Sequence, residues 1–502
     1  MSNIRRQSII ASLVIYFGFA IGLLNVYFFT KEGLFTTTQY GLTSIFISIA
    51  TMMMAFANLA MPAYIYKFYH YYDDHLEPRK NDMITWALLM GTIGFILVAV
   101  AGWFFRDIVI RKFGSNSPEL LIYYYWIFPL GFGLTIYNIL EVYTWQMGKP
   151  VLTNFLREVQ WRLLVTLLIV LLYLGVVKDF DMFIKLYSFT YPVIALILFI
   201  YLFAKGRIHF SFRPSKVTRR YLKKILTLCS FVYSGTLIFS ISLVFDSLVI
   251  ASVLKDGMEK VAVFGLATIL TSVIQAPQRS IIATTLPHLS RAWKEKNQPR
   301  LQQIYQRSSI NLLIFACLLF SLIALNYTEA ILTFGLQQEY LLGFSAFIFL
   351  GLTRVVDLGT GVNTEIIGTS NYWRFQLVSG VILLALMLPL TYIMAKRYDI
   401  LGPAIANLVS ISIYNAIRIG FLWKKFRLFP FTRYTLYTIL SAGISYVICY
   451  FLFRQVGGLA GLVLRSSAFL LLYLGMVIYW KFTPDIQPVL ETIKKRLRFK
   501  SF

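Results

Sequence analysis

The sequence predicts an all-α polytopic membrane protein with about 14 transmembrane helices, because lipid-length apolar stretches follow one another along the chain. Of its 502 residues, 58% are hydrophobic and only 14% are charged, which leaves too little polar surface for a soluble core. Lipid offers no hydrogen-bond partner to a backbone outside helices or closed barrels. The predicted spans are residues 9–29, 42–66, 83–105, 120–147, 155–177, 181–204, 225–254, 261–290, 308–327, 339–367, 372–394, 400–424, 433–453 and 458–480.

The charged residues lie mainly between these spans and predict the topology. The formal net charge is +25, but the Lys and Arg residues lie in connectors, so no nucleic acid is expected as a partner. With a cytoplasmic N-terminus, inner connectors and ends carry about 31 Lys and Arg and outer connectors about 11, as the positive-inside rule requires. The even number of spans then places both termini in the cytoplasm. The first apolar run is too long for a cleavable signal peptide, so we expect it to remain as a span.

An internal repeat predicts two lobes. Tyr40-Gly41-Leu42 opens span 2 and Phe264-Gly265-Leu266 opens span 8, and each span continues to a proline, Pro62 or Pro287. Parallel repeats of this kind are typical of transporters that bind cargo between lobes. The predicted domains are an N-terminal lobe at 1–204, a basic cytoplasmic linker at 205–224, a C-terminal lobe at 225–424, appended spans 13 and 14 at 425–481, and a basic cytoplasmic tail at 482–502.

Short motifs in spans 2 and 8 carry a resemblance to a known superfamily. They are Gln39-Tyr40-Gly41-Leu42 with Leu59-Ala60-Met61-Pro62, and Ala276-Pro277 with Leu286-Pro287-His288-Leu289-Ser290-Arg291. On these motifs the sequence resembles the multidrug/oligosaccharidyl-lipid/polysaccharide exporters, and most closely their polysaccharide (O-antigen type) flippase branch. The resemblance implies two six-helix lobes in a V-shaped arrangement plus two C-terminal helices. It also implies a central cavity, lined by spans 1, 2, 7 and 8, that opens alternately to each side.

The resemblance further implies a function. The expected protein is a flippase that moves a lipid-linked (polyprenyl-pyrophosphate) oligosaccharide across the inner (cytoplasmic) membrane by alternating access. Its setting would be surface polysaccharide biosynthesis, such as that of the lipopolysaccharide O-antigen, with the bilayer and a polysaccharide polymerase or glycosyltransferases as partners. Drug-exporting members usually have twelve spans, so spans 13 and 14 favour a lipid-linked cargo. A multidrug or cation antiporter of the same superfamily is the alternative.

Charged residues inside spans predict where a cargo binds, because a charge in mid-bilayer costs about 3 kcal/mol or more and normally faces a bundle interior or a water-filled cavity. Arg279 follows Gln275 by four positions on a similar face of span 8, and Asp246 lies well inside span 7. A guanidinium can bind a pyrophosphate in a bidentate manner. We therefore predict that Arg279, Asp246 and Gln275 bind the substrate. An internal Arg279–Asp246 ion pair is the alternative.

Span 10 carries three charges in the segment GLTRVVDLGTGVNTEIIG. Arg354, Asp357, Gly361 and Glu365 are spaced so that they would share one face of a continuous helix. Arg354 is predicted to bind the substrate, and Asp357 and Glu365 are predicted ion-coupling residues because a buried carboxyl can take up a proton. The alternative is an Arg354–Asp357 pair with close helix packing at the glycines.

Three further polar residues in the first lobe are candidates. Asn25 and Asn58 are predicted to bind the substrate and Glu141 to couple an ion, with interhelical hydrogen bonding as the alternative for each. The other arginines inside spans lie nearer span ends and are expected to extend toward water: Arg162, Arg418 and Arg465.

A membrane enzyme that acts on lipid-linked glycans is the competing class. The short outer connectors present no convincing acid/base pair, Asp179 and Asp181 being the nearest, and no phosphate-binding glycine-rich loop is present. We therefore expect no enzyme activity and no cofactor. The group His70-Tyr71-Tyr72-Asp73-Asp74-His75 is interpreted as a solvated connector, so no metal site is expected.

Overall fold

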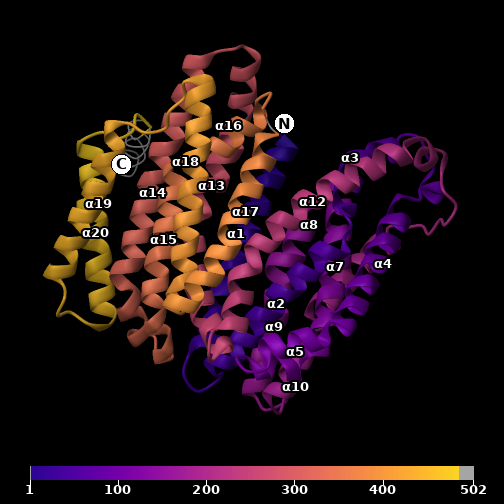
Figure 1. Cartoon of the computed structure of the whole chain (residues 1–502), viewed down its shortest axis with the longest axis horizontal. Coiled ribbons are helices and arrows are strands. Elements are labelled where there is room, and N and C mark those ends of the chain that lie inside the picture. Colours follow the sequence, from indigo (N-terminus) through magenta and orange to yellow (C-terminus); the bar gives the residue numbers. More distant parts are fainter. Residues whose placement is uncertain (1, 373, 486–502) are drawn as a thin grey trace, which may run out of the picture. The chain divides into compact units, whose positions relative to one another are not determined.

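A computed structural model of the chain describes residues 2–372 and 374–485, apart from the side chains of residues 2–13, 279, 280 and 283. The elements of this described part are helices, as Figure 1 shows, and the predicted all-α fold is confirmed. By their contacts the helices form two compact units, Met1–Ala262 and Val263–Phe502.

The first unit is built around α7. Its elements are α1 (Ser2–Thr30), α2 (Thr37–Ala57), α3 (Met61–Asp73), η1 (Pro78–Lys80), α4 (Met83–Phe104), α5 (Arg106–Phe113), α6 (Pro118–Ile122), η2 (Tyr124–Trp126), α7 (Ile127–Gln146), α8 (Pro150–Asn154), η3 (Phe155–Gln160), α9 (Trp161–Tyr173), α10 (Phe180–Tyr187), α11 (Thr190–Ala204) and α12 (Lys216–Val253). Helix α7 packs on α2, α3, α4 and α11. It approaches α11 closely because Gly133 lies against the Pro192 backbone, where a Cβ would collide.

Helix α13 (Gly257–Lys294) begins in the first unit and continues in the second. The second unit then contains α14 (Gln298–Thr333), η4 (Gln338–Leu342), α15 (Gly343–Gly359), α16 (Asn363–Thr369), α17 (Phe375–Tyr398), α18 (Leu401–Phe426), α19 (Arg433–Leu452) and α20 (Gly458–Tyr479). Helix α18 packs on α15 and α17, and α14 packs on α15, α19 and α20 (Figure 1). Cys317, Phe469 and Tyr473 belong to the apolar core between α14, α19 and α20. That core fixes the last two helices to this unit.

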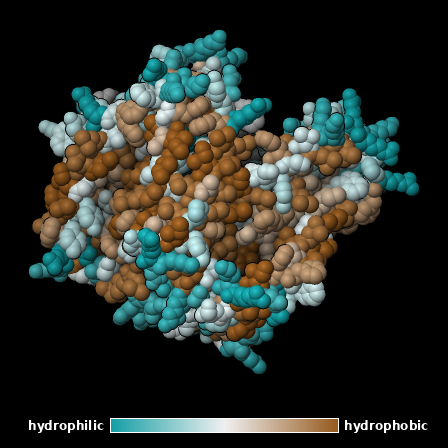
Figure 2. Space-filling view, in the orientation of Figure 1, coloured by the Kyte–Doolittle hydropathy of each residue, from teal (hydrophilic) through white to brown (hydrophobic). Residues whose placement is uncertain are grey.

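Eleven helices of the described part are long and apolar enough to cross a membrane. Helices α1 and α7 and the interrupted run of α8, η3 and α9 occupy the remaining predicted spans. On the face drawn in Figure 2, hydrophobic side chains cover the middle of the helices and hydrophilic side chains gather at helix ends. Large apolar side chains that are exposed within these helices, such as Leu471 in α20, are surfaces that lipid chains would cover. The chain is a multi-pass membrane protein.

The second predicted span, 42–66, is not one continuous helix. Helix α2 ends at Ala57 and α3 begins at Met61, because Leu59 and Ala60 adopt positive φ angles of 47° and 57°. The Asn58 carboxamide stabilises this turn by accepting a hydrogen bond from the Ala60 backbone N–H at 3.0 Å. Pro62 then lies in the first turn of α3, a position that needs no N–H donor.

Helix α12 begins earlier than predicted, at Lys216 rather than at residue 225. Ser215 caps it, accepting a hydrogen bond from the Thr218 N–H at 3.1 Å. The fully buried Asp82 carboxylate accepts from the Ser215 N–H at 2.9 Å and from the Thr218 hydroxyl at 2.7 Å. These bonds attach the end of the basic segment to the first unit, and α12 packs on α2 and α3. The first unit therefore includes all of α12 and ends after it, at Ala262. The lobe limits deduced from the sequence stay a prediction.

Candidate functional site

The second unit contains a buried polar cluster where predicted span 10 is interrupted. Helix α15 ends at Gly359 and α16 begins at Asn363. Between them, Gly361 has a φ of 70°, in the region that favours glycine. A Cβ at Gly361 would lie 2.9 Å from the Ser309 backbone nitrogen of α14. The close approach of the two backbones therefore accounts for glycine at this turn.

The interruption corrects the geometry that the sequence predicted. Asp357 lies on α15 and Glu365 on α16, and the residues at 360–362 between them are not helical. Arg354 and Asp357 remain neighbours by helical spacing on α15, and both are half-buried. The prediction that Arg354, Asp357, Gly361 and Glu365 share one face of a continuous helix is wrong beyond Asp357. Spacing alone could not reveal a break that depends on contact with α14.

Arg418 of α18 is the buried cation of this cluster, with 2% of its surface exposed. Its Nη1 donates to Thr364 Oγ1 at 2.6 Å and to Asn363 Oδ1 at 3.2 Å. Its Nε donates to Ser379 Oγ at 3.4 Å, and its guanidinium lies 4.4 Å from the centroid of the Tyr414 ring. The expectation that Arg418 extends toward water is wrong, because its partners lie on α16, α17 and α18 inside the unit.

Asn415, nearly one turn before Arg418, extends the network to a carboxylate. Its Nδ2 donates to Asp357 Oδ1 at 2.9 Å, and its Oδ1 accepts from Thr360 Oγ1 at 3.1 Å and from Asn363 Nδ2 at 2.8 Å. The charges of Asp357 and Glu365 act on Arg418. We call the following residues the Arg418 network: Asp357, Thr360, Asn363, Thr364, Glu365, Asn415 and Arg418. It connects α15, α16 and α18 across the interruption.

The first unit contains a second charged cluster around Glu141 of α7, which is 1% exposed. Its Oε2 pairs with Arg157 Nη1 at 3.2 Å, and its Oε1 has no hydrogen-bond partner in the described part of the chain. Arg157 lies in η3, a π-helical turn between α8 and α9. Such turns are rare and occur frequently at functional sites. The ion-coupling role of Glu141 stays a prediction, now with a defined partner.

Asn25 connects α1 to α9 rather than facing an open space. Its Nδ2 donates to the Arg162 carbonyl at 2.9 Å, and its Oδ1 accepts from Thr166 Oγ1 at 2.6 Å. This is the interhelical hydrogen bonding named above as the alternative for Asn25. Asn58 instead makes a local hydrogen bond within the α2–α3 turn, and its role in substrate binding stays a prediction. Arg162 pairs with Glu158 at 2.8 Å instead of extending to water. Arg465 likewise pairs with Glu329 of α14 at 3.0 Å.

The substrate-binding residues predicted in spans 7 and 8 are placed only in part. The side chain of Arg279 lies outside the described residues. Gln275 is half-buried on α13, and its Nε2 donates to Gln278 Oε1 at 2.9 Å. Asp246 is half-buried on α12, and both Asp246 and Arg354 take part in polar or electrostatic interactions. Substrate binding by these residues stays a prediction.

Sequence reasoning missed the centre of the Arg418 network. Asn363 and Asn415 are each 2% exposed and lie within predicted spans 10 and 12. The available signal was that Asn415 and Arg418 lie three positions apart, hence on one face of a predicted span. Within the ranges that the structure describes, no group of three or more His, Cys, Asp or Glu side chains is placed to hold a metal ion.

Comparison with known proteins shows which solved structures share this fold. No protein-family profile matches the sequence, and no curated protein matches it. Among solved structures, the lipid II flippase MurJ in an inward closed conformation matches with a TM-score of 0.71 and 15% identity, over 94% of this chain and 99% of that one. The chain has the fold of that flippase. An inward-facing multidrug resistance MATE transporter of the MOP superfamily matches with a TM-score of 0.64 and 16% identity, over 81% of this chain and 95% of that one. A mutant form of the Vibrio cholerae MATE transporter VcmN matches with a TM-score of 0.54 and 14% identity, over 85% of this chain and 98% of that one.

These neighbours are a lipid II flippase and multidrug transporters, and the resemblance to the O-antigen flippase branch stays a prediction. The predicted fold class, an all-α polytopic membrane protein, is therefore confirmed. The neighbours are transporters and flippases rather than enzymes.

Proposed function

We propose that this protein is a flippase that moves a lipid-linked oligosaccharide across the cytoplasmic membrane by alternating access. The cargo would be a polyprenyl-pyrophosphate oligosaccharide for surface polysaccharide of the O-antigen type, and both termini would be cytoplasmic. The observation that carries the proposal is the match to a lipid II flippase over 94% of this chain and 99% of that one. A fold shared over nearly the full length of both chains supports a related transport cycle, although related folds can carry different cargoes.

Ionisable residues inside the helices support a transport function. Arg418, Asp357 and Glu141 lie inside helices that the bilayer would surround, where each charge is costly unless paired or facing a polar path. In such bundles, ionisable residues typically mark substrate or ion routes. We propose that Arg279 and Arg354 contact the pyrophosphate with Asp246 and Gln275 nearby, and that Asp357, Glu365 and Glu141 couple an ion. A polysaccharide polymerase or glycosyltransferases would act on the same lipid intermediate.

A multidrug or cation antiporter is the second candidate. The match to the MATE transporter at a TM-score of 0.64 favours it. That match covers 81% of this chain, against 94% for the lipid II flippase. The additional matched length favours the lipid-linked cargo, since this chain carries two helices, α19 and α20, beyond the twelve spans usual in drug exporters.

The test measures polyprenyl-linked glycans by mass spectrometry, together with the leaflet from which they are accessible, in cells depleted of this protein. Depletion should accumulate a lipid-linked oligosaccharide accessible from the cytoplasmic side, and the wild-type chain should reverse it. Arg279→Ala should fail to rescue, whereas Arg291→Ala, on the same helix and paired with Glu295 at its exposed end, should rescue.

Unchanged lipid intermediates with altered drug sensitivity would refute the flippase and favour the antiporter. Full rescue by Arg279→Ala would leave the flippase standing and remove Arg279 from its site.

A further inference from the structure

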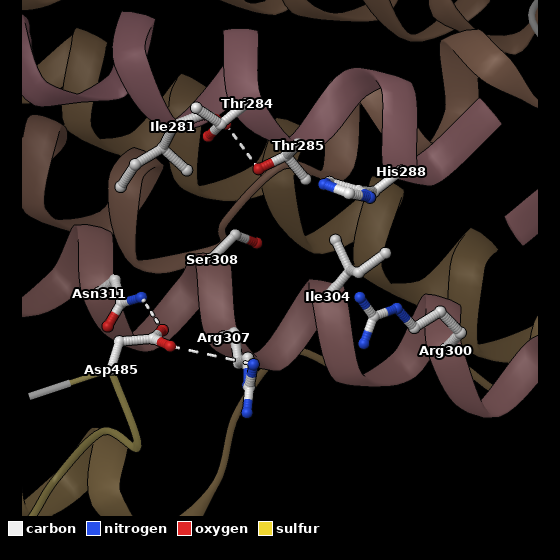
Figure 3. A pocket seen from close by; sticks show the side chains of 10 residues that line it. All are labelled: Ile281, Thr284, Thr285, His288, Arg300, Ile304, Arg307, Ser308, Asn311 and Asp485. Atoms are coloured by element: carbon white, nitrogen blue, oxygen red, sulfur yellow. Dashed lines mark hydrogen bonds and ion pairs between the residues drawn. The ribbon is translucent and has the colours of Figure 1, made fainter. Parts of the chain in front are cut away.

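A cavity of about 320 Å³ opens beside α13 and α14 in the second unit (Figure 3). Its polar lining comes from the halves of these helices nearer the predicted cytoplasmic side and from the segment that follows α20. We call this cavity the basic pocket, after Arg300 and Arg307. Its other polar lining residues are Thr284, Thr285, His288, Ser308, Asn311 and Asp485. It lies within one unit and includes none of the substrate-binding residues predicted above.

The pocket is built to attract an anion. Figure 3 shows His288 and Arg300 at one end of it and Asn311 with Asp485 at the other. Arg300 donates to Gln303 at 2.7 Å and retains further guanidinium donors, since arginine has five N–H groups. Together Arg300 and Arg307 place two permanent positive charges around one cavity. A guanidinium group binds phosphate oxygens well.

One anion already lies in the pocket, and it belongs to the chain itself. Asp485 Oδ2 accepts a hydrogen bond from Asn311 Nδ2 at 2.7 Å, and its Oδ1 lies 3.9 Å from Arg307 Nη1. The side chains of Arg307 and Asp485 are 43% and 48% exposed. An ion pair this long and this exposed is weak, worth at most about a fivefold change in an equilibrium constant. A doubly charged phosphate group could therefore displace the carboxylate.

We propose that the basic pocket binds the phosphate or diphosphate end of a lipid from the cytoplasmic side, and that Asp485 occupies the pocket until that group displaces it. The volume is at the lower end of ligand sites, which span roughly 300–1,000 Å³, so the pocket accepts a phosphate end rather than an oligosaccharide. This inference deepens the proposed function and rests on it for the identity of the lipid. The pocket is a first binding position on the cytoplasmic side, and Asp485 is an internal competitor for it.

Binding to the full-length chain in nanodiscs tests the pocket. The probes are a polyprenyl diphosphate without sugar, phosphatidylglycerol and inorganic pyrophosphate. Arg300→Ala and Arg307→Ala should each weaken binding of the polyprenyl diphosphate about tenfold, the effect of one charge-assisted contact. Arg291→Ala removes the same charge from the same end of α13 outside the pocket, and should change binding less than about twofold. Asp485→Asn should tighten binding about threefold, because it removes the competing charge.

Equal weakening by Arg291→Ala and Arg307→Ala would overturn the pocket, because it would indicate a diffuse surface charge effect. Unchanged or weaker binding by Asp485→Asn would overturn the displacement. If the polyprenyl diphosphate or phosphatidylglycerol binds and the arginine variants weaken that binding, the result supports the site and identifies its lipid. If only inorganic pyrophosphate binds, the proposal that the pocket binds a lipid is overturned. Pocket binding combined with unchanged lipid intermediates in depleted cells would refute the proposed function alone, and the reverse result would refute the pocket alone.

Discussion

Replacing Arg418 by methionine should strongly destabilise the second unit. Methionine fills similar space but removes the guanidinium, which is 2% exposed and donates at 2.6 Å to Thr364 and at 3.2 Å to Asn363. Two charge-assisted hydrogen bonds at about 1.5 kcal/mol each give a loss of about 3 kcal/mol. Removing one partner of a buried charged network costs about 3–5 kcal/mol, because the remaining charges lose their compensation. The two magnitudes agree, so we expect at least about 3 kcal/mol.

Thermal unfolding of the purified chain, followed by circular dichroism, measures this effect. A loss of about 3 kcal/mol lowers Tm by roughly 6–12 °C for a unit of this size. Arg397→Met is the matched control, because Arg397 lies exposed in the last turn of α17. Its expected loss is below about 0.5 kcal/mol.

A double-mutant cycle distinguishes lost charge compensation from lost packing. Glu365→Gln removes one of the negative charges that act on Arg418. The double variant Arg418→Met with Glu365→Gln should recover at least about 1 kcal/mol relative to the sum of the single changes. A loss below about 1 kcal/mol for Arg418→Met, or strictly additive changes, would refute the view that Arg418 compensates the half-buried carboxylates of Asp357 and Glu365.

Two further predictions concern the first unit. Gly41→Ala should cost about 1–3 kcal/mol, because the added Cβ would collide with the Met258 carbonyl. Gly420→Ala is the control in the second unit, and because the space around Gly420 is open it should be neutral or stabilising. Thermal unfolding compares the two variants, and equal effects would exclude the close contact at Gly41. Arg157→Ala should cost about 1–2 kcal/mol, because it leaves the buried Glu141 carboxylate without its partner, although the Arg157 side chain is itself 48% exposed. Glu141→Gln should cost less than about 1 kcal/mol. Thermal unfolding measures both changes, and the reverse order would contradict the pairing.

The helices were predictable because the thickness of the bilayer sets the length of each apolar stretch in the sequence. The apolar stretches, the two appended helices and the all-α fold followed from the length of each run and from its charged connectors. The glycine of the Tyr40-Gly41-Leu42 motif also has a local reason, since the Met258 carbonyl lies directly against it. The contact with the Met258 backbone explains why this position of the motif holds a residue without a Cβ.

The interior of the second unit was less predictable, because contacts between distant segments decide it. The break at 360–362 depends on the Ser309 backbone beside Gly361. Arg418 lies near the end of a predicted span, and its sequence position was compatible with a side chain that extends to water. Only the placement of α16 beside α18, with Asn363 and Thr364 as acceptors, shows that Arg418 is buried. Hydrophobic periodicity identifies a helix but not the partners of its polar residues.

Transport by the purified protein tests the flippase proposal most directly. Liposomes with the reconstituted chain would carry a fluorescent polyprenyl-diphosphate oligosaccharide, and a membrane-impermeant quencher would report the leaflet in which it lies. The proposal predicts exchange between leaflets that is fast compared with protein-free liposomes and that is inhibited by unlabelled substrate. Exchange no faster than in protein-free liposomes, together with uptake of drug cations by the same preparation, would contradict the proposal and establish the antiporter.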